Sequence, residues 1–210
     1  YKADGSTKLY GSYVSAKVKT LPSKIQGFGS KSCTASTVTL KWTKNTSVDG
    51  YVIQQYKGGK WVTIKTITKN STVSHKVTGL SPSKTYKFRI RGYKKDGSKK
   101  LYSASYTTKS VQTLPSTVKG FAYKTRTKSS ITLKWAKNTS ATGYVLEQYK
   151  GGKWVKIKTI TKYSTTSYKV SGLKKGTSYK FRIKAYKSSA SGSTKWYGKT
   201  TAIAVKTLTK

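Results

Sequence analysis

The stretch TYKFRIRGY, which runs from Thr85 to Tyr93, decides the fold class of this protein. Tyr86, Phe88 and Ile90 alternate in it with three cationic residues. Strict alternation of apolar and polar residues places the two kinds of side chain on opposite faces of a β-strand. The stretch therefore predicts a strand with one face toward an apolar core and one basic face toward water.

Neighbouring segments carry related strand patterns. STVTLKW at 36–42 alternates in the same way, and DGYVIQQYKGGKWVTIKTI at 49–67 holds two β-rich segments around Gly58-Gly59. Paired glycines supply the positive φ that tight hairpins need. With no helical periodicity in the chain, we predict an all-β protein whose seven short strands per repeat form a two-sheet sandwich. Its expected core comprises Leu40, Trp42, Tyr51, Ile53, Phe88 and Ile90.

The whole pattern recurs at a spacing of 93 residues. YKGGKWVTIKTITK at 56–69 returns as YKGGKWVKIKTITK at 149–162, and Trp42 is matched by Trp135. A period of this length fits a complete small domain better than a solenoid unit. We therefore predict one domain over residues 22–114 and a second over residues 115–210.

Residues 1–21 align with the end of the first repeat when one gap is allowed. They are interpreted as the C-terminal strand or hairpin of a preceding repeat, so we expect the chain to come from a longer polypeptide. An isolated hairpin is marginally stable in water. This segment is expected either to be frayed or to pack against the first domain or a neighbouring molecule.

Three motifs together carry a family resemblance. They are the tryptophans at 42 and 135, the Gly-Tyr pairs at 50–51 and 143–144, and the segments VTGLSPSKTYKFRI at 77–90 and VSGLKKGTSYKFRI at 170–183. In these motifs the chain resembles tandem fibronectin type III domains of the bacterial extracellular type. Leu80 and Tyr86 resemble the leucine and tyrosine corner of that family. The resemblance implies immunoglobulin-like sandwiches in an extracellular module that binds, spaces or displays and is rarely catalytic.

Catalytic side chains are scarce. General acid–base chemistry needs positioned carboxylates, histidine or an activated nucleophile. The available candidates are Asp4, Asp49, Asp96, Glu147 and His75. Asp4 and Asp96 begin Asp-Gly turns, Glu147 is expected to pair with Arg182 across strands, and His75 is expected to face the core in place of an aromatic residue. We therefore predict no enzyme activity, no cofactor and no metal site.

The chain contains a single cysteine, Cys33, so it can form no intrachain disulfide. The second repeat has Arg126 at the same position, which predicts an exposed site in a loop. An incidental thiol and intermolecular pairing in an oxidising space both remain open at this point.

The charge is strongly one-sided. Lys and Arg total 44 against 4 Asp and Glu, which gives a formal net charge of +40. Four of the cations are arginines, and lysine is a hydrated point charge that suits many polyanions better than it reads base sequence. We expect partners such as cell-wall teichoic acid or an acidic polysaccharide, with non-specific nucleic acid binding in vitro.

No apolar run is long enough for membrane insertion. The expected location is secreted or on the cell surface of a Gram-positive bacterium.

The candidate polyanion-binding residues form one outward row in each repeat. They are Lys87, Arg89 and Arg91 in the first and Lys180, Arg182 and Lys184 in the second. An alternative function is carbohydrate binding by stacking on exposed aromatic rings. The candidates for that role are Tyr56, Tyr102, Tyr149, Trp196 and Tyr197.

Trp196 and Tyr197 follow a Gly/Ser-rich loop and have two interpretations. They can stack on sugar rings, or they can pack at the end of the sandwich or between domains. A third function class is an inert spacer, with neighbouring repeats of the same parent chain as its contacts. The short junction TLPSTVKGF at 113–121 predicts a semi-rigid, extended arrangement of the domains.

Overall fold

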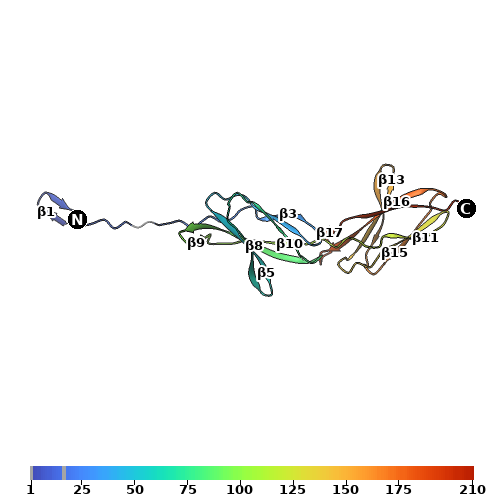
Figure 1. Ribbon diagram of the computed structural model, residues 1–210, viewed down its shortest axis with the longest axis horizontal. Helices are drawn as coiled ribbons and strands as arrows, with labels where there is room; N and C mark the ends of the chain where they lie inside the picture. The colour runs from blue at the N-terminus through green and yellow to red at the C-terminus, as the bar shows by residue number, and fades with distance from the viewer. Residues whose placement is uncertain (1, 16–17) are drawn as a thin grey trace.

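The computed structural model of the chain describes residues 2–15 and 18–210, and all regular structure within them is β. Two β-sandwiches lie end to end, and a small hairpin lies beyond the first of them on the N-terminal side (Figure 1). The predicted all-β, two-sandwich fold class is confirmed. Among the described residues there is no helix long and apolar enough to span a membrane.

The first sandwich consists of a three-stranded sheet in the order β3-β4-β7 and a five-stranded sheet in the order β10-β8-β5-β6, with β9 paired to the end of β8. Its strands are β3 (Gly29–Cys33), β4 (Val38–Lys41), β5 (Gly50–Lys57), β6 (Lys60–Ile67), β7 (Ser74–Val77), β8 (Thr85–Asp96), β9 (Lys99–Tyr102) and β10 (Thr107–Gln112). All strand pairs are antiparallel. The last of the seven predicted strands is divided into β9 and β10 by the short segment 103–106.

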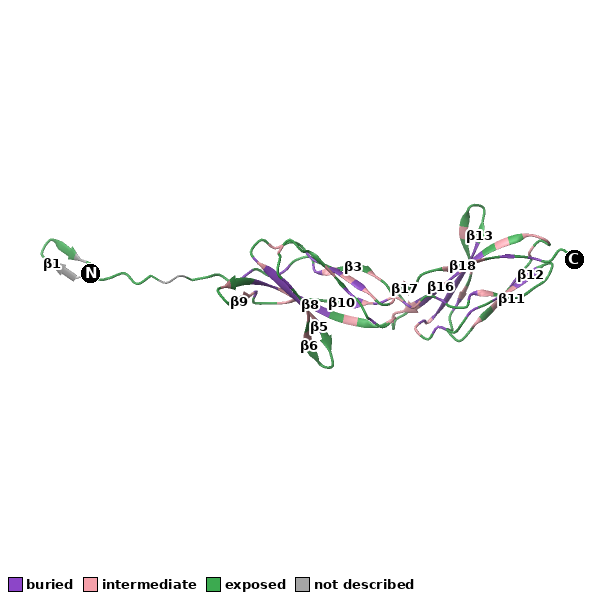
Figure 2. Ribbon diagram, viewed as in Figure 1, coloured by how far each residue is buried: buried purple, intermediate pink, exposed green. Residues whose placement is uncertain are grey.

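The second sandwich repeats this topology, with sheets β11-β12-β15 and β14-β13-β16-β17, and β18 paired to β16. Its strands are β11 (Ala122–Arg126), β12 (Ser130–Lys134), β13 (Gly143–Lys150), β14 (Lys153–Ile160), β15 (Ser167–Ser171), β16 (Ser178–Ser188), β17 (Lys195–Tyr197) and β18 (Thr201–Lys206). In both sandwiches the central strands of the larger sheet are among the most buried parts of the chain (Figure 2).

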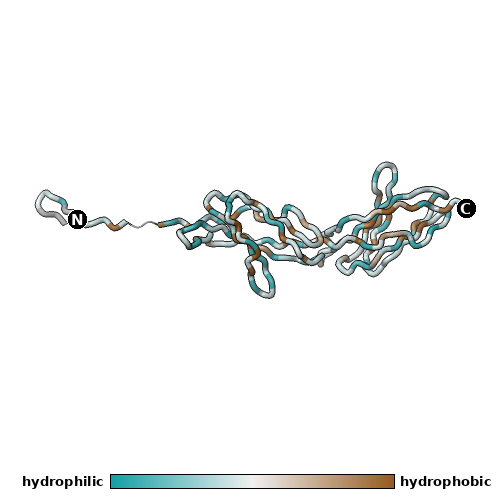
Figure 3. The backbone as a smooth tube through the Cα atoms, in the orientation of Figure 1, coloured by the Kyte–Doolittle hydropathy of each residue, from teal (hydrophilic) through white to brown (hydrophobic). Residues whose placement is uncertain are grey.

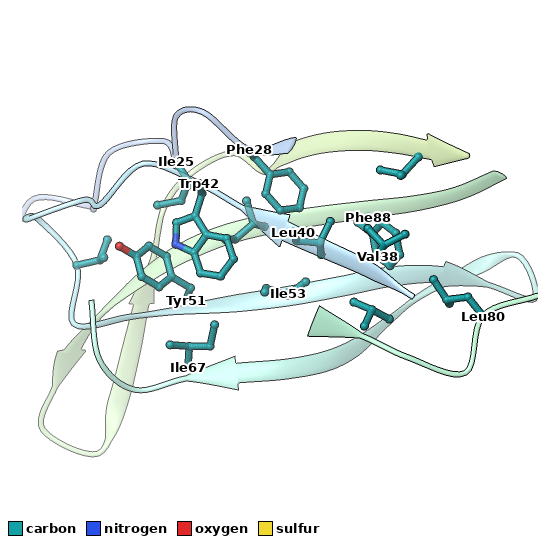
Figure 4. Close-up of a cluster of buried hydrophobic side chains, with 14 residues drawn as sticks. Ile25, Phe28, Val38, Leu40, Trp42, Tyr51, Ile53, Ile67, Leu80 and Phe88 are labelled. Atoms are coloured by element: carbon teal, nitrogen blue, oxygen red, sulfur yellow. The ribbon is translucent and has the colours of Figure 1, made fainter. Parts of the chain in front are cut away.

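An apolar core fills the space between the two sheets of each sandwich. Figure 4 shows the indole of Trp42 directed into the first core, where its ring lies 5.3 Å from that of Tyr51 in an edge-on arrangement. The predicted members are confirmed. Leu40, Tyr51, Ile53, Phe88 and Ile90 are fully buried and Trp42 is 4% exposed. The apolar residues are spread along the strands in short alternating segments (Figure 3), as expected when each strand turns one face inward.

Local backbone geometry agrees with the turn residues. Gly58 and Gly59 join β5 to β6 with φ values of 53° and 79°, so both occupy the left-handed region that a tight hairpin requires. The corner motif is also formed. The hydroxyl oxygen of Tyr86 accepts a 2.7 Å hydrogen bond from the backbone N–H of Ser81, and Tyr179 makes the equivalent bond with Lys174.

The N-terminal segment forms a hairpin of β1 (Lys2–Asp4) and β2 (Thr7–Leu9). Its register pairs Lys2 with Leu9, which reproduces the pairing of Lys94 with Leu101 between β8 and β9. The described residues between β2 and the first sandwich are exposed, although the Lys19 ammonium forms an ion pair with Asp96. Tyr1 and residues 16–17, which also belong to the predicted fragment, lie outside the described residues.

Candidate polyanion-binding surface

The outer face of the five-stranded sheet presents the basic row of the first sandwich. Phe88 and Ile90 on β8 are buried in the core, so the alternate residues Lys87, Arg89 and Arg91 point away from it. Strands β10 and β5 flank β8 on either side, with β6 beyond β5, so side chains from three other strands share this face with the basic row.

Both arginines of this row contact two aromatic rings each. The guanidinium carbon of Arg89 lies 4.4 Å from the ring centroid of Trp61 and 3.7 Å from that of Tyr106. The guanidinium carbon of Arg91 lies 3.6 Å from the centroid of Tyr102 and 4.8 Å from that of Tyr106. Each such contact stabilises the cation by about 0.5–2 kcal/mol, depending on how far it is removed from water. We call these five residues the arginine–aromatic surface.

The hydrogen bonding of the two guanidinium groups is incomplete. Arg89 donates a 2.7 Å hydrogen bond from Nε to the side-chain oxygen of Gln54. The Nε atom of Arg91 is buried and has no hydrogen-bond partner among the residues that the structure describes. Over the same residues, no carboxylate forms an ion pair with either arginine. The guanidinium groups of this surface therefore contact aromatic rings and, at Arg89, one neutral amide.

The second sandwich differs at several positions of this face, among which Glu147, Lys184 and Thr200 stand in place of Gln54, Arg91 and Tyr106. Arg182 lies 4.5 Å from the ring centroid of Trp154, and Lys184 lies 5.0 Å from that of Tyr197. Glu147 stands where the first repeat has Gln54, and it accepts hydrogen bonds from Arg182 Nε at 2.5 Å and from Lys184 Nζ at 3.4 Å. The predicted cross-strand ion pair is confirmed, and a second cation joins it.

The electrostatic state of Glu147 follows from these contacts. Burial by itself raises the pKa of a carboxyl group, because it disfavours the charged form. The hydrogen bond from Arg182 and the charges of Lys184 and Arg182 outweigh burial and hold the pKa of Glu147 below its usual range. The carboxylate is therefore ionised at neutral pH and compensates the cations of its own face.

The other predicted surface residues lie toward the hairpin tips. Lys87 Nζ is 6.0 Å from the ring centroid of Tyr56, and Lys180 Nζ is 5.8 Å from that of Tyr149. The two tyrosines are 43% and 41% exposed, and each ring packs edge-on against the tryptophan opposite it on the next strand. The basic residues and these tyrosines are thus neighbours in both sandwiches.

Sequence reasoning missed two members of the arginine–aromatic surface, Trp61 and Tyr106, and it also missed Trp154, the counterpart of Trp61 on the second sandwich. A signal was present for the tryptophans, because both stand in the repeated phrase and pair directly with Tyr56 or Tyr149 across the hairpin. Tyr106 immediately precedes β10, which pairs with β8 alongside the arginines. It could have been found by pairing the last strand with TYKFRIRGY in antiparallel register.

Trp196 lies at the junction of the two sandwiches. It lines an open cavity of about 440 Å³ together with residues of the first sandwich, among them Leu114. Tyr197 is 42% exposed and lines an adjoining cavity of about 420 Å³. The backbone approaches closely here, because a Cβ atom on Gly198 would lie 2.8 Å from the carbonyl oxygen of Pro115. Trp196 is therefore part of the domain junction and does not stand at a free loop tip.

The thiol and the imidazole are both half-buried. Cys33 was expected to be exposed, but its Sγ packs inward and donates a 3.2 Å hydrogen bond to the carbonyl oxygen of Gln112. Burial raises the pKa of the Cys33 thiol, and backbone hydrogen bonds oppose this in part.

His75 faces the sandwich interior near its rim, where burial and the charge of Lys65 lower its pKa. Within the described residues, no three His, Cys, Asp or Glu side chains gather into a possible metal site.

The fold and this surface define a class: tandem immunoglobulin-like β-sandwiches that present a basic sheet face. The chain belongs to the fibronectin type III domain family, which it matches over residues 23–109 and 116–199. Domains of this family are generally non-catalytic modules. A two-domain fibronectin type III segment of chicken tenascin shares the fold, with a TM-score of 0.53 and 21% identity over 87% of this chain and 99% of that one.

Two bacterial relatives are several times longer than this chain. It is 33% identical over 180 residues to chitinase A1 of Niallia circulans, which covers 79% of this chain and 24% of the chitinase. It is 27% identical over 205 residues to exoglucanase B of Cellulomonas fimi, which covers 88% of this chain and 18% of the exoglucanase. The chain thus spans a quarter or less of the length of either relative.

Proposed function

We propose that this chain is a non-catalytic extracellular module that binds anionic polymers through its cationic surface. The observation that carries the proposal is the one-sided charge, 44 cationic residues against 4 acidic ones. Three of the acidic side chains are already engaged: Glu147 by Arg182, Asp96 by Lys19, and Asp49 by the backbone N–H of residue 95. A surface of this kind attracts polyanions and concentrates them near the protein.

The polymer that fits best is cell-wall teichoic acid or an acidic polysaccharide. The names of the two bacterial relatives, a chitinase and an exoglucanase, denote enzymes that act on glycan polymers, which supports a location outside the cell. Lysines spread over the surface match an extended chain of negative groups without requiring one fixed binding geometry. Attachment of this kind would hold a parent protein at a bacterial wall.

The test measures retention of the purified chain on isolated cell wall as salt is raised. If the cations hold the polymer, retention falls continuously, because the screening length shrinks from about 10 Å at 0.1 M to about 3 Å at 1 M and bound counterions are recovered. Wall from which the teichoic polymers have been removed should retain much less protein, and uncharged glucan should not compete. Undiminished binding to stripped wall at 0.5 M salt would overturn the proposal.

A second candidate is a spacer within a larger protein, and the position of Trp196 at the domain junction favours it. Contacts between the sandwiches would fix their relative orientation and keep the parts of a parent chain apart. In the same experiment a pure spacer would show no retention on either wall at any salt concentration. Carbohydrate stacking is less well supported, because Arg91 covers the ring of Tyr102 and the junction holds Trp196.

A further inference from the structure

The two basic faces share the same strand order but differ in side chains and in how their positive charge is compensated. On the first, Gln54 is a neutral partner of Arg89. On the second, Glu147 compensates both Arg182 and Lys184. Both partners bind the arginine Nε, but the carboxylate of Glu147 also neutralises the charge, whereas the amide of Gln54 leaves it available to an external anion. The first face lacks this internal anion among the described residues.

The geometry also limits which parts of the two free arginines a ligand can reach. Trp61, Tyr106 and Tyr102 have ring centroids within 4.8 Å of the guanidinium carbons, so both cations lie over aromatic rings. Among the described residues no hydrogen bond engages the terminal N–H groups of either arginine, and their planar fork matches an oxyanion approaching in the same plane. The rings also hold the two cations in place before any ligand arrives, which lowers the entropy lost on binding.

Arg91 adds an independent indication. Its Nε is buried and has no hydrogen-bond partner among the described residues, in contrast to Arg89, whose Nε is bonded to Gln54. A buried polar atom without a partner is unfavourable, and such atoms deserve a specific explanation. Because this Nε is buried, an external oxyanion would meet Arg91 at its terminal N–H groups, and no described residue forms a hydrogen bond with them.

We propose that the arginine–aromatic surface of the first domain is a dedicated oxyanion site, and that Glu147 weakens anion binding at the corresponding face of the second domain by compensating Arg182 and Lys184. The ligand is a carboxylate, sulfate or phosphate group carried by an acidic glycan or a teichoic acid. This inference rests on the proposed function and makes it specific: the lysines attract the polymer over the whole surface, and Arg89 and Arg91 bind its anionic groups at one place.

A nucleic acid is a poorer match for this surface. Proteins that bind single strands without sequence preference offer open aromatic faces on which bases stack. Here the guanidinium groups of Arg89 and Arg91 already occupy faces of Trp61, Tyr106 and Tyr102. Bases would have to displace these cations, whereas an oxyanion binds at their free edges.

The decisive experiment exchanges the neutral amide of Gln54 and the carboxylate of Glu147, which occupy the same position in the two domains. Gln54→Glu should give Arg89 the internal carboxylate that the second domain has, and Glu147→Gln should remove it from the second domain. Gln26→Glu is the matched control, because it makes the same charge change at an exposed position of the first domain. Affinities for heparin, polygalacturonate, poly(glycerol phosphate) and single-stranded DNA are measured at a constant 0.15 M salt.

We expect Gln54→Glu to weaken binding of the three non-nucleic polymers by about tenfold or more, the scale of one charge-assisted contact. Gln26→Glu should change it by less than about twofold, since one unit among so many charges alters the diffuse attraction little. Glu147→Gln should strengthen binding. The ranking of heparin, polygalacturonate and poly(glycerol phosphate) identifies whether sulfate, carboxylate or phosphate is preferred.

The four arginines of the chain provide a direct readout by NMR. Addition of the polymer that binds with the highest affinity should shift the Nε–H signals of Arg89 and Arg91 and leave those of Arg126 and Arg182 nearly unchanged.

Gln54→Glu is expected to fold, because the second domain carries Glu at the same position, and its thermal unfolding verifies this. Equal effects of Gln54→Glu and Gln26→Glu, uniform shifts of all four signals, or tighter binding of DNA than of every other polymer would each overturn the inference. Failure of the wild-type chain to bind any polymer would instead overturn the proposed function.

Discussion

Two tryptophans of the first domain show how position sets the role of a residue. Trp42 is 4% exposed between the sheets, whereas Trp61 lies half-buried on the outer face beside Arg89. The first contributes to stability by removing a large apolar surface from water. Trp61 presents one face of its ring to the guanidinium group of Arg89 and belongs to the surface that we propose as the binding site.

Trp42→Ala should therefore destabilise the first domain by about 3–5 kcal/mol, a large part of the stability of a domain of this size. The second domain has its own core around Trp135 and should keep its folded state. Calorimetry should show one transition moved to lower temperature and the other in place. Simultaneous loss of both transitions would show that the domains do not fold independently. Trp61→Ala serves as the control and should have a much smaller effect on unfolding.

Glu147 predicts a pH dependence that is confined to the second domain. Its pKa is lower in the folded state than in an unfolded chain, so its pairing stabilises the fold above the unfolded value and this stabilisation is lost as pH falls through the folded value. Below about pH 4.5, the ordinary value for the group, the melting temperature of the second domain should begin to fall.

The comparison is made between the wild type and Glu147→Gln over the same acidic range. In the variant, the melting temperature of the second domain should lack the part of the acid-induced decrease that Glu147 causes. The first domain has Gln54 at the corresponding position and should melt identically in both proteins. Indistinguishable acid profiles of the second domain would show that the pair with Arg182 and Lys184 does not contribute to folding.

At the scale of elements, both sandwiches depend on a close approach at the start of the third strand. A Cβ atom added to Gly50 would lie 2.0 Å from the carbonyl oxygen of Ile67 and 2.7 Å from the hydroxyl oxygen of Tyr93. Gly143 has the same surroundings in the second domain, with Ile160 in place of Ile67. The Gly-Tyr pairs of the sequence thus mark places where two strands and a buried tyrosine leave no room for a side chain.

Gly50→Ala should consequently destabilise the first domain by at least about 1–3 kcal/mol, the usual cost of overpacking, because the nearest atom belongs to backbone and cannot rotate away. Denaturant unfolding followed by tryptophan fluorescence measures the change. Gly29→Ala is the control, since a Cβ atom there meets nothing within 4 Å. Equal stability of the two variants would contradict the packing seen at Gly50.

For the whole molecule, the junction determines how the two sandwiches act together. The connection around Pro115 is short, and Trp196 and Tyr197 line the cavities between the sandwiches. If these contacts set the orientation, the basic faces of successive domains have a defined relation to each other along the array. A long polymer bound to one sandwich would then run in a defined direction relative to the other.

Trp196→Ala should loosen this junction without unfolding either domain, because the side chain lies outside both apolar cores. Small-angle X-ray scattering should show a broader distribution of interparticle distances, and residual dipolar couplings of the two domains should become independent. The melting temperatures should stay close to those of the wild type. Unchanged scattering and unchanged couplings would mean that Trp196 does not restrain the junction.

The sequence by itself determined the strands, the repeat and the core, because each depends on local patterns. Alternation along TYKFRIRGY assigns Phe88 and Ile90 to the core, and paired glycines specify the hairpin turn at 58–59. Family motifs and the repeat spacing then led to the correct fold. The basic row at Lys87, Arg89 and Arg91 was also visible, since residues that alternate with a buried set must face outward.

Only the tertiary structure decided what surrounds that row. Trp61 on β6 and Tyr106, which immediately precedes β10, are far apart in the sequence, and they reach Arg89 because the sheet order places β6, β5, β8 and β10 side by side. The half-burial of Cys33 likewise depends on Gln112, 79 residues away. Local patterns report which face a side chain takes, whereas its partners on that face depend on strand order and register. The Glu147–Arg182 pair was predictable from sequence because it joins neighbouring strands, whereas the rings around Arg89 and Arg91 depended on contacts between distant segments.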